Sequence, residues 1–328
     1  MQVLHSPQYQ VAHYKSLIVC GSVWLCPLCA AKISERRRDE LERAVSRHIA
    51  QNGAVYMATY TVSHSRYDDL SCLLQAFLRA RKRIKQGKYA QWRKRDFGIV
   101  GTISVLEATW SSLNHWHPHS HELFFTLACL SDLNSATYEQ KARTAWQQAA
   151  AHEGLRMDEE HGFRLDRTYG AVADYIAKFG REPVRKPWGI ESEMTKGHIK
   201  TGRGSVIEHL TPFAMLYQIM QGNTVLIPVF QEYAHWFKGR HQLHWSKGLR
   251  KRLLDTDEEP TDEELAAADL DDAMLLGLIT RAQWRVVLAN DARGELLEVA
   301  RSGDWQQVET FLAGIGCDLS QREPIQLA

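Results

Sequence analysis

Four histidines occupy alternate positions directly before an apolar run: His115, His117, His119 and His121 precede Leu-Phe-Phe at 123–125. Because successive side chains of an extended chain point to opposite faces, His117, His119 and His121 would project together from one side of a strand. Imidazole is a common metal ligand, and several on one face make a metal platform. The alternative is a solvated, His-rich loop before a core strand. The spacing favours a metal-binding strand.

A metal ion held by two imidazoles needs a further ligand, and Mg²⁺ or Mn²⁺ prefers oxygen. The alternating segment 101–109 predicts a strand that contains Glu107. If this strand pairs antiparallel with the histidine strand, Glu107 comes to lie beside His119 and His121. We therefore expect Glu107 to be the third metal ligand. His117 is the alternative, either as a ligand or as a contact to phosphate.

Three motifs, in this order along the chain, resemble those of a known family. The segment Ala-Thr-Tyr-Thr-Val-Ser-His at 58–64 looks like the first motif of HUH endonucleases. Trp-His-Pro-His-Ser-His at 116–121 resembles their histidine motif, in the version of rolling-circle plasmid replication initiators. Tyr-Ile-Ala-Lys-Phe at 175–179 resembles the motif that carries the nucleophilic tyrosine. The resemblance extends over most of residues 20–254.

The resemblance implies that Tyr175 attacks a DNA phosphodiester and leaves a 5′-phosphotyrosine and a free 3′-hydroxyl. A phenol has a pKa near ~10, so the attack requires that its proton be removed or its anion stabilised. Lys178, one helical turn after Tyr175, is suited to stabilise the phenolate or to hold the phosphate. Phe179 stands where some relatives carry a second tyrosine, so the chain resembles the single-tyrosine class.

The residue that ends the reaction cycle is left open by the sequence. Some relatives place a glutamate one helical turn before the tyrosine, as the base for a terminating hydrolysis. That position is Ala171 in this chain. Asp174 and Asp166 are the candidates that remain.

A second site is indicated by cysteines near the amino terminus. Cys20, Cys26 and Cys29 form a C-x5-C-x2-C pattern, and the Cys-Pro-Leu-Cys turn suits a tetrahedral zinc ion. This segment also resembles the amino-terminal part of the same replication family. We expect structural Zn²⁺ with His13 as fourth ligand. The alternatives within reach in the sequence are His5 and His48.

The other cysteines, Cys72, Cys129 and Cys317, stand apart in apolar settings and are predicted to be buried thiols. Such uneven clustering argues against a secreted disulfide framework and for a reducing, cytoplasmic environment. No apolar stretch reaches the ~20 residues needed to span a bilayer, so we expect no membrane partner.

Charge is distributed unevenly along the chain. Residues 255–328 hold 5 Lys and Arg against 17 Asp and Glu, a net of −12. Residues 1–254 hold the remaining 35 against 22, a net of +13. A basic body of this kind suits a polyanion such as DNA. The predicted DNA-binding residues are His64, Trp92, Arg93, His117, Lys200 and Arg203.

Periodicity and breakers predict the organisation of the chain. We expect helices at 34–51, 70–85, 137–153 and 171–179, and strands at 55–62, 99–108, 119–128 and 163–166. These elements suggest an α+β fold, an HUH-type central antiparallel sheet with helices on one face. The tail is predicted to be helical at 263–277, 281–290, 293–302 and 305–315. The predicted domains are a zinc-binding segment and helix at 1–50, the HUH nuclease at 51–204, a basic, helical DNA-contact extension at 205–254, and an acidic helical tail at 255–328.

The sequence thus favours an initiator of rolling-circle replication that nicks and rejoins single-stranded or hairpin origin DNA. Its expected partners include a host helicase and polymerase. Two alternatives stay open: a single-strand transposase of the HUH type, which would use the same residues, and a zinc-containing DNA-binding regulator without catalytic activity.

Overall fold

The structure is a computed structural model in which the chain forms two compact units. One unit is Ser22–Pro260, and the other combines Met1–Gly21 with Thr261–Ala328. The predicted partition into four domains has other boundaries than these two units, and it stays a prediction. The residues described are 1–8, 10–15, 19–166, 209–268 and 273–320.

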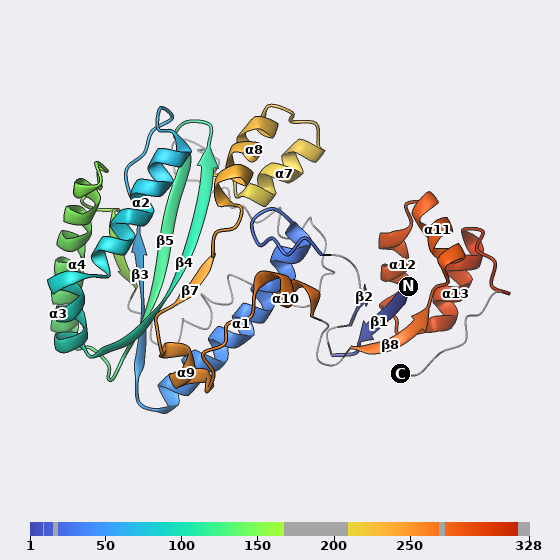
Figure 1. Ribbon diagram of the computed structural model, residues 1–328, viewed down its shortest axis with the longest axis horizontal. Helices are drawn as coiled ribbons and strands as arrows, with labels where there is room; N and C mark the ends of the chain where they lie inside the picture. Colours follow the sequence, from blue (N-terminus) through green and yellow to red (C-terminus); the bar gives the residue numbers. More distant parts are fainter. Residues whose placement is uncertain (9, 16–18, 167–208, 269–272, 321–328) are drawn as a thin grey trace. The chain divides into compact units, whose positions relative to one another are not determined.

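The first unit is built on a five-stranded sheet in the order β6-β3-β5-β4-β7, and every pair of neighbouring strands is antiparallel. This confirms the predicted α+β class with a central antiparallel sheet, and the histidine strand β5 is its middle strand (Figure 1). The strands are β3 (Ala54–Tyr60), β4 (Ile99–Ser111), β5 (His115–Thr126), β6 (Phe163–Asp166) and β7 (Leu243–Trp245).

Helices cover both faces of this sheet, so the prediction of helices on one face was wrong. Three of them, α2 (Leu70–Ile84), α3 (Gly87–Phe97) and α4 (Asp132–His152), pack on one face. On the other face lie α1 (Pro27–Ala50) and α9 (Leu249–Leu254) (Figure 1). The reason is visible in β5, which is apolar on both faces at its carboxyl end: Leu123 and Phe125 pack towards α1, and Phe124 packs against Tyr138 of α4.

Helix α1 begins earlier than predicted, at Pro27, where proline is tolerated because the first helical N–H has no partner inside the helix. Leu41 and Val45 are buried against β3, β4, β5 and α9, as their helical spacing predicts. Ile49, expected on the same side, is 49 % exposed. Burial of each leucine or valine contributes about 1.5–3 kcal/mol, so this core fixes α1 across the sheet.

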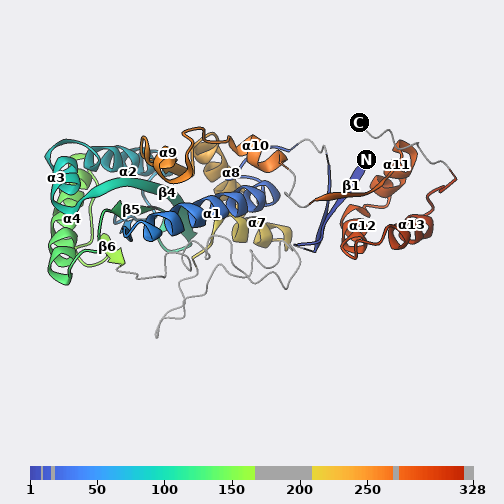
Figure 2. The ribbon, with the colours of Figure 1, turned by 90° about the horizontal axis from the view of Figure 1, so that it is seen from below.

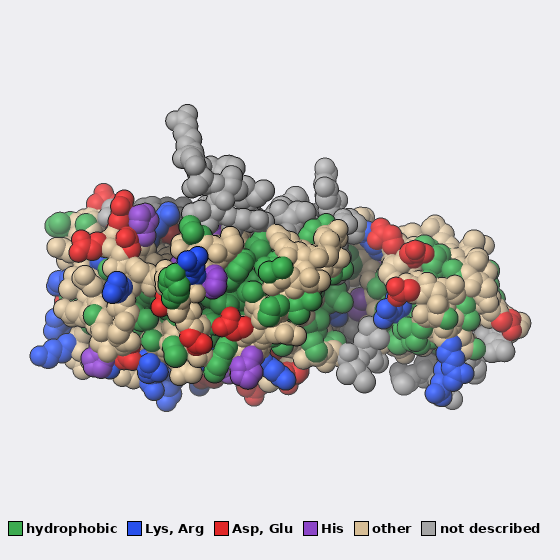
Figure 3. Space-filling model, turned by 90° about the horizontal axis from the view of Figure 1, so that it is seen from above, with side chains coloured by type: hydrophobic (Ala, Val, Ile, Leu, Met, Phe, Trp, Pro, Cys, Tyr) green, Lys and Arg blue, Asp and Glu red, His purple; other side chains and the backbone are tan. Residues whose placement is uncertain are grey.

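Two further helices, α7 (Pro212–Met220) and α8 (Leu226–Phe237), lie in the segment 205–254 that was predicted to be a helical extension, although their bounds were not predicted. In the view from below, α1 runs past the sheet towards them (Figure 2). Trp24, just before α1, packs edge-on against Phe237 and donates from its indole to the carbonyl of Arg240, 2.7 Å away. Exposed apolar side chains, including Met220 and Val225, gather over α7 and α8 (Figure 3).

The second unit pairs the two ends of the chain. Its three-stranded antiparallel sheet has the order β2-β1-β8, and the strands are β1 (Gln2–Ser6), β2 (Val11–Tyr14) and β8 (Met274–Leu278). The prediction of one helix over 263–277 was wrong: residues 274–278 form β8, because they pair with β1. The helices of this unit are α10 (Asp262–Ala267), α11 (Arg281–Ala289), α12 (Arg293–Ala300) and α13 (Trp305–Gly314).

The sheet and helices of the second unit enclose a core of their own. Val3 and Tyr14 from the amino-terminal hairpin pack with Val287, Leu296 and Leu312 from α11, α12 and α13. The Tyr14 hydroxyl donates to the carbonyl of Arg293 at 2.9 Å, and burial raises the pKa of this phenol well above its usual value. The predicted helical tail is therefore completed by a hairpin from the start of the chain.

The three cysteines outside the amino-terminal group differ in exposure. Cys72 and Cys129 are exposed, so the prediction that they are buried was wrong, whereas Cys317 is buried as expected. Among the described residues, no helix is long and apolar enough to cross a membrane.

Candidate functional site

The register of β4 and β5 brings the predicted metal ligands together. Glu107 of β4 lies directly opposite His119 of β5, and His121 follows two residues later on the same face. Their ligand atoms all lie within 4.8 Å of one another. The expectation that antiparallel pairing would place Glu107 beside both histidines is confirmed as geometry.

Within this group the imidazoles face the carboxylate. His119 Nε2 lies 2.9 Å from Glu107 Oε2, and His121 Nε2 lies 3.7 Å from the same oxygen. The three side chains are partly shielded, with exposed fractions of 14 % for His119, 13 % for His121 and 27 % for Glu107. Two nitrogens and a carboxylate oxygen, open to solvent on one side, form a donor set that suits a divalent cation.

Glu107 and His119 each shift the pKa of the other. Burial acts to raise the pKa of Glu107, but the contacts with His119 and His121 outweigh it and hold the pKa well below its usual range. Burial likewise acts to lower the pKa of His119, and the hydrogen bond and charge of Glu107 reverse this, so the pKa of His119 is raised. Both shifts come from the contact between the two groups, and a metal ion that binds His119 Nε2 requires this nitrogen without its proton.

The outer nitrogens of both imidazoles have partners that fix the ring orientation. His121 Nδ1 lies 3.0 Å from Thr59 Oγ1 on the neighbouring strand β3. His119 Nδ1 lies 3.2 Å from the carbonyl oxygen of His117. Such partners leave Nε2 of each ring directed at Glu107, as is typical of metal-ligating histidines.

Pro118 marks the place where the sheet narrows. Strand β3 pairs with β5 only from Ser120 onward, so at Pro118 the strand has a neighbour on the β4 side alone among the described strands. A proline has no N–H to donate, and this position requires none on the open side. Pro118 thus lies where β5 enters the sheet, as is typical of a residue that cannot donate to a strand ladder.

Two further histidines continue the row beyond the metal-ligand group. His117 and His64 stack at 4.5 Å between ring centroids with an interplanar angle of 6°. Burial lowers the pKa of His117 to about 3, with His119, His64 and His209 adding to the effect. His209 was missed by the sequence analysis, because it lies 92 positions after His117 and in no recognised motif. DNA contact by His64 and His117 stays a prediction.

The opposite face of β5 holds a buried ion cluster. The Glu122 carboxylate, 0 % exposed, accepts from Arg93 at 2.5 Å and from Arg81 at 3.0 Å, and Lys85 Nζ lies 3.7 Å away. Burial acts to raise the pKa of Glu122, but Arg93, Arg81 and Lys85 hold it well below its usual range. The prediction that Arg93 contacts DNA from the surface was wrong: its guanidinium is 4 % exposed and neutralises Glu122.

Trp92 is predicted to stack on a base. In the structure, part of its ring packs against other aromatic side chains of the same unit. Its ring stacks near those of Tyr89 and Tyr138, and Lys141 Nζ lies 4.6 Å above it. The remaining part of the ring is accessible, and a role in DNA binding stays a prediction. Trp116 of the histidine motif is a packing residue: it stacks on Tyr233 of α8 and donates to Glu232 at 3.0 Å.

Several predicted residues lie outside the described residues: Tyr175, Lys178, Asp174, Lys200 and Arg203. Their roles stay predictions. Asp166, the other candidate for ending the cycle, is the last residue of β6 and pairs with Arg164 at 2.6 Å.

The three amino-terminal cysteines form a second group of possible metal ligands. The sulfurs of Cys20, Cys26 and Cys29 lie within 4.8 Å of one another. Cys26 is the residue before α1, and its carbonyl accepts the first helical hydrogen bond from Ala30 at 2.8 Å. Among the described residues, no histidine or carboxylate is grouped with these thiols. His13 lies on β2, and its role as fourth ligand stays a prediction.

Comparison with known proteins gives two curated relatives. The chain is 26 % identical to "Protein rep" of Streptomyces lividans over 92 % of its own length and 78 % of that protein. It is 30 % identical to a "Neomycin resistance protein" of Streptomyces cyanogenus, over 33 % of the chain and 30 % of that protein. No protein-family model matches the chain. No solved structure matches it either.

Proposed function

We propose that this chain is a plasmid replication initiator that nicks and rejoins single-stranded DNA at an origin of rolling-circle replication. The observation that carries the proposal is the grouping of Glu107, His119 and His121 on one face of the central strand. The likeness to a protein named "Protein rep" over nearly the whole chain supports the same biological role. The single-strand transposase and the zinc-containing regulator have no comparable support.

The residues present fit a hard divalent cation. Glu107, His119 and His121 would hold Mg²⁺ or Mn²⁺, since their donor atoms converge and the histidine rings are oriented from behind. When bound, such an ion polarises the attacked phosphate and offsets the charge that develops there. Thr59 and the carbonyl of His117 hold the two rings ready for this role.

The proposed covalent step belongs to Tyr175. Its phenol loses a proton and its oxygen forms a bond to phosphorus, while the bond between phosphorus and the 3′ oxygen breaks and that oxygen takes up a proton. The product is a 5′-phosphotyrosine on the protein and a free 3′-hydroxyl on the DNA. Lys178 would stabilise the phenolate. Rejoining is the reverse transfer and needs no nucleotide.

The cysteine group would hold structural zinc, with thiolate ligands from Cys20, Cys26 and Cys29. Zinc at this place would connect the start of α1 to the preceding loop. The expected partners remain single-stranded or hairpin origin DNA and a host helicase and polymerase, in the cytoplasm.

The proposal is tested by incubating the protein with 3′-labelled single-stranded oligonucleotides of randomised sequence and Mn²⁺. We expect label to migrate with the protein on a denaturing gel, and the Tyr175→Phe protein to form less than about 1 % of this adduct, because it lacks the nucleophile. EDTA should abolish the adduct, whereas metal analysis should still find zinc held by the thiolates.

Tyr217→Phe is the matched control, since Tyr217 lies on α7 and in no candidate site. Equal amounts of adduct from the Tyr175→Phe and parent proteins would refute the assignment of the nucleophile. A parent protein that binds DNA but forms no adduct at all would favour the non-catalytic regulator.

A further inference from the structure

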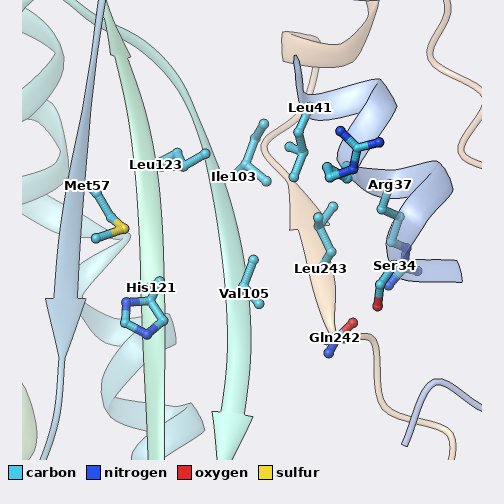
Figure 4. Close-up of a pocket in the computed structure, with 11 residues that line it drawn as sticks. Ser34, Arg37, Leu41, Met57, Ile103, Val105, His121, Leu123, Gln242 and Leu243 are labelled. Carbon is cyan, nitrogen blue, oxygen red and sulfur yellow. The ribbon is translucent and has the colours of Figure 1, made fainter. Parts of the chain in front are cut away.

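A small pocket of about 40 Å³ lies beside the candidate metal site (Figure 4). His121 belongs to both, because its ring lines the pocket while Nε2 faces Glu107. Side chains from the sheet meet those of α1 and of the segment that leads into β7 across this space. The apolar part of its wall consists of Leu41, Met57, Ile103, Val105, Leu123 and Leu243.

Two largely buried arginines also line the pocket: Arg37 is 7 % exposed and the Arg38 side chain 15 %. Arg37 and Arg38 come from α1, and Gln242 precedes β7. Figure 4 shows Arg37 and Ser34 on the helix across from the strand that carries His121. Arg38 also pairs with Asp39 at 2.8 Å and Glu42 at 3.3 Å, so part of its charge is compensated. An apolar hollow with positive charge in its lining suits a group that is itself apolar but attached to an anionic backbone.

We propose that this pocket holds the apolar edge of a thymine base, in the nucleotide next to the phosphate bound at Glu107, His119 and His121. The inference rests on the proposed function, because it requires single-stranded DNA at the metal site. It adds a preference for one base at the nucleotide that adjoins the cleaved bond.

Size and polarity select this occupant. A volume of about 40 Å³ holds roughly three water-sized groups, which is too little for a whole purine. A phosphate or a polar base edge placed against the six apolar side chains would lose hydration without compensation. Thymine is the one DNA base with a methyl group on its edge, and this methyl is read by apolar contact in other protein–DNA complexes.

Continuity with the metal site supplies the second argument. Val105 of β4 lies opposite His121 of β5 and opposite Leu243 of β7, so it forms the pocket floor between these strands. Glu107 follows Val105 by two residues on the same face of β4. A strand of DNA whose phosphate lies at Glu107 therefore has its neighbouring nucleotide within reach of the pocket.

The test compares the affinity of the full-length protein for fluorescent dT12 and dU12 in the presence of Mn²⁺, by fluorescence anisotropy. The two oligonucleotides differ only by the thymine methyl. Burial of one methyl predicts that dT12 binds about fourfold more tightly than dU12. Equal affinities would overturn the pocket inference and leave the proposed function standing, whereas a lack of binding to either probe would overturn both.

Two variants distinguish binding of the methyl group in the pocket from its other effects, such as stronger base stacking. Val105→Ile adds one methylene at the pocket floor, and we expect it to remove the difference between dT12 and dU12. Val100→Ile makes the same change on the same strand outside the pocket, and should keep the difference. If Val105→Ile also keeps it, the methyl is read elsewhere and the inference fails. The comparison on the unmodified protein stands even if a variant folds poorly.

Discussion

At the scale of single residues, Glu107 supplies the negative charge of the candidate metal site. Its carboxylate accepts from His119 at 2.9 Å and lies 3.7 Å from His121, and its lowered pKa means that it stays ionised through the neutral range. The site thus presents a permanent negative charge between two imidazoles. A divalent cation between the three groups would be bound by all of them at once.

Replacing this carboxylate by an amide tests its role. We expect Glu107→Gln to bind Mn²⁺ about 10–100-fold more weakly, because the amide keeps the size but loses the charge. The electron paramagnetic resonance signal of free Mn²⁺ measures the affinity. Glu139→Gln, on the exposed part of α4, is the control and should leave it unchanged. Unaltered Mn²⁺ binding by Glu107→Gln would exclude this carboxylate as a ligand.

The contrast between Glu107 and Arg93 shows which residue roles the sequence could predict. Glu107 was found because strand alternation and a short hairpin determine which residues face each other. Arg93 lies in a basic run and was expected on the surface. Its place in the core depends on Glu122, which is 29 positions away and on another element, so no local pattern indicates the pair.

At the scale of elements, the predicted strands of the central sheet and helix α2 were found close to their true bounds, and β6 was found at 163–166 as predicted. Helix α3 was missed: its basic run at 93–95 was interpreted as a DNA contact, and Gly87 begins it. Strand β8 was mistaken for helix because a short apolar run fits either state, and only its pairing with β1 decides. Elements fixed by distant partners are the ones that local periodicity fails to predict.

Helix α2 delivers Arg81 and Lys85 to the reverse face of β5. Lys85 Nζ donates to Ser104 Oγ at 2.7 Å and lies 3.7 Å from Glu122. Burial lowers the pKa of Lys85 from 10.5 to about 8, and Arg81 and Arg93 add to this while Glu122 opposes it. Lys85 is therefore the member of this cluster that loses its proton as the pH rises above neutral.

This arrangement predicts how stability depends on pH. Between about pH 8 and 10.5 the unfolded chain keeps a proton on Lys85 that the folded chain has released, so the free energy of unfolding should rise with pH in this window. Lys85→Met should flatten that rise relative to the parent protein. Urea unfolding at pH 7.5 and 9.5 measures the effect. Lys82→Met, exposed on the same helix, should keep the slope of the parent protein. An unchanged slope in Lys85→Met would contradict the lowered pKa.

At the scale of the whole molecule, one of the two compact units is built from two segments that are far apart in the sequence. Residues 1–21 and 261–328 form one unit, and residues 22–260 form the other. Strand β1 lies between β2 and β8 and is therefore the only described strand that pairs with both. Local patterns do not predict this pairing, because each end alone is too short to reveal a shared core.

Removal of the amino-terminal hairpin should therefore act at the far end of the sequence. We expect a protein without residues 2–14 to lose protection from hydrogen exchange in α11, α12 and α13, since Val3 and Tyr14 leave their core. Amides of β4 and β5 should keep theirs. Hydrogen exchange followed by mass spectrometry measures both.

Gln10→Gly is the control, because it changes the hairpin turn at a residue with φ of 49° and leaves the strands in place. Full protection of α11–α13 after removal of the hairpin would show that the carboxyl-terminal helices need no strand from the start of the chain.

The central position of β1 also sets an order of events during synthesis. On the ribosome, β1 emerges before β8 and has only β2 to pair with until β8 and helices α11 to α13 have followed. The five-stranded sheet, whose strands all lie between residues 54 and 245, can assemble earlier. A nascent chain would thus carry a finished histidine strand before β1 has its second partner, and the second unit could close only after β8 had been made.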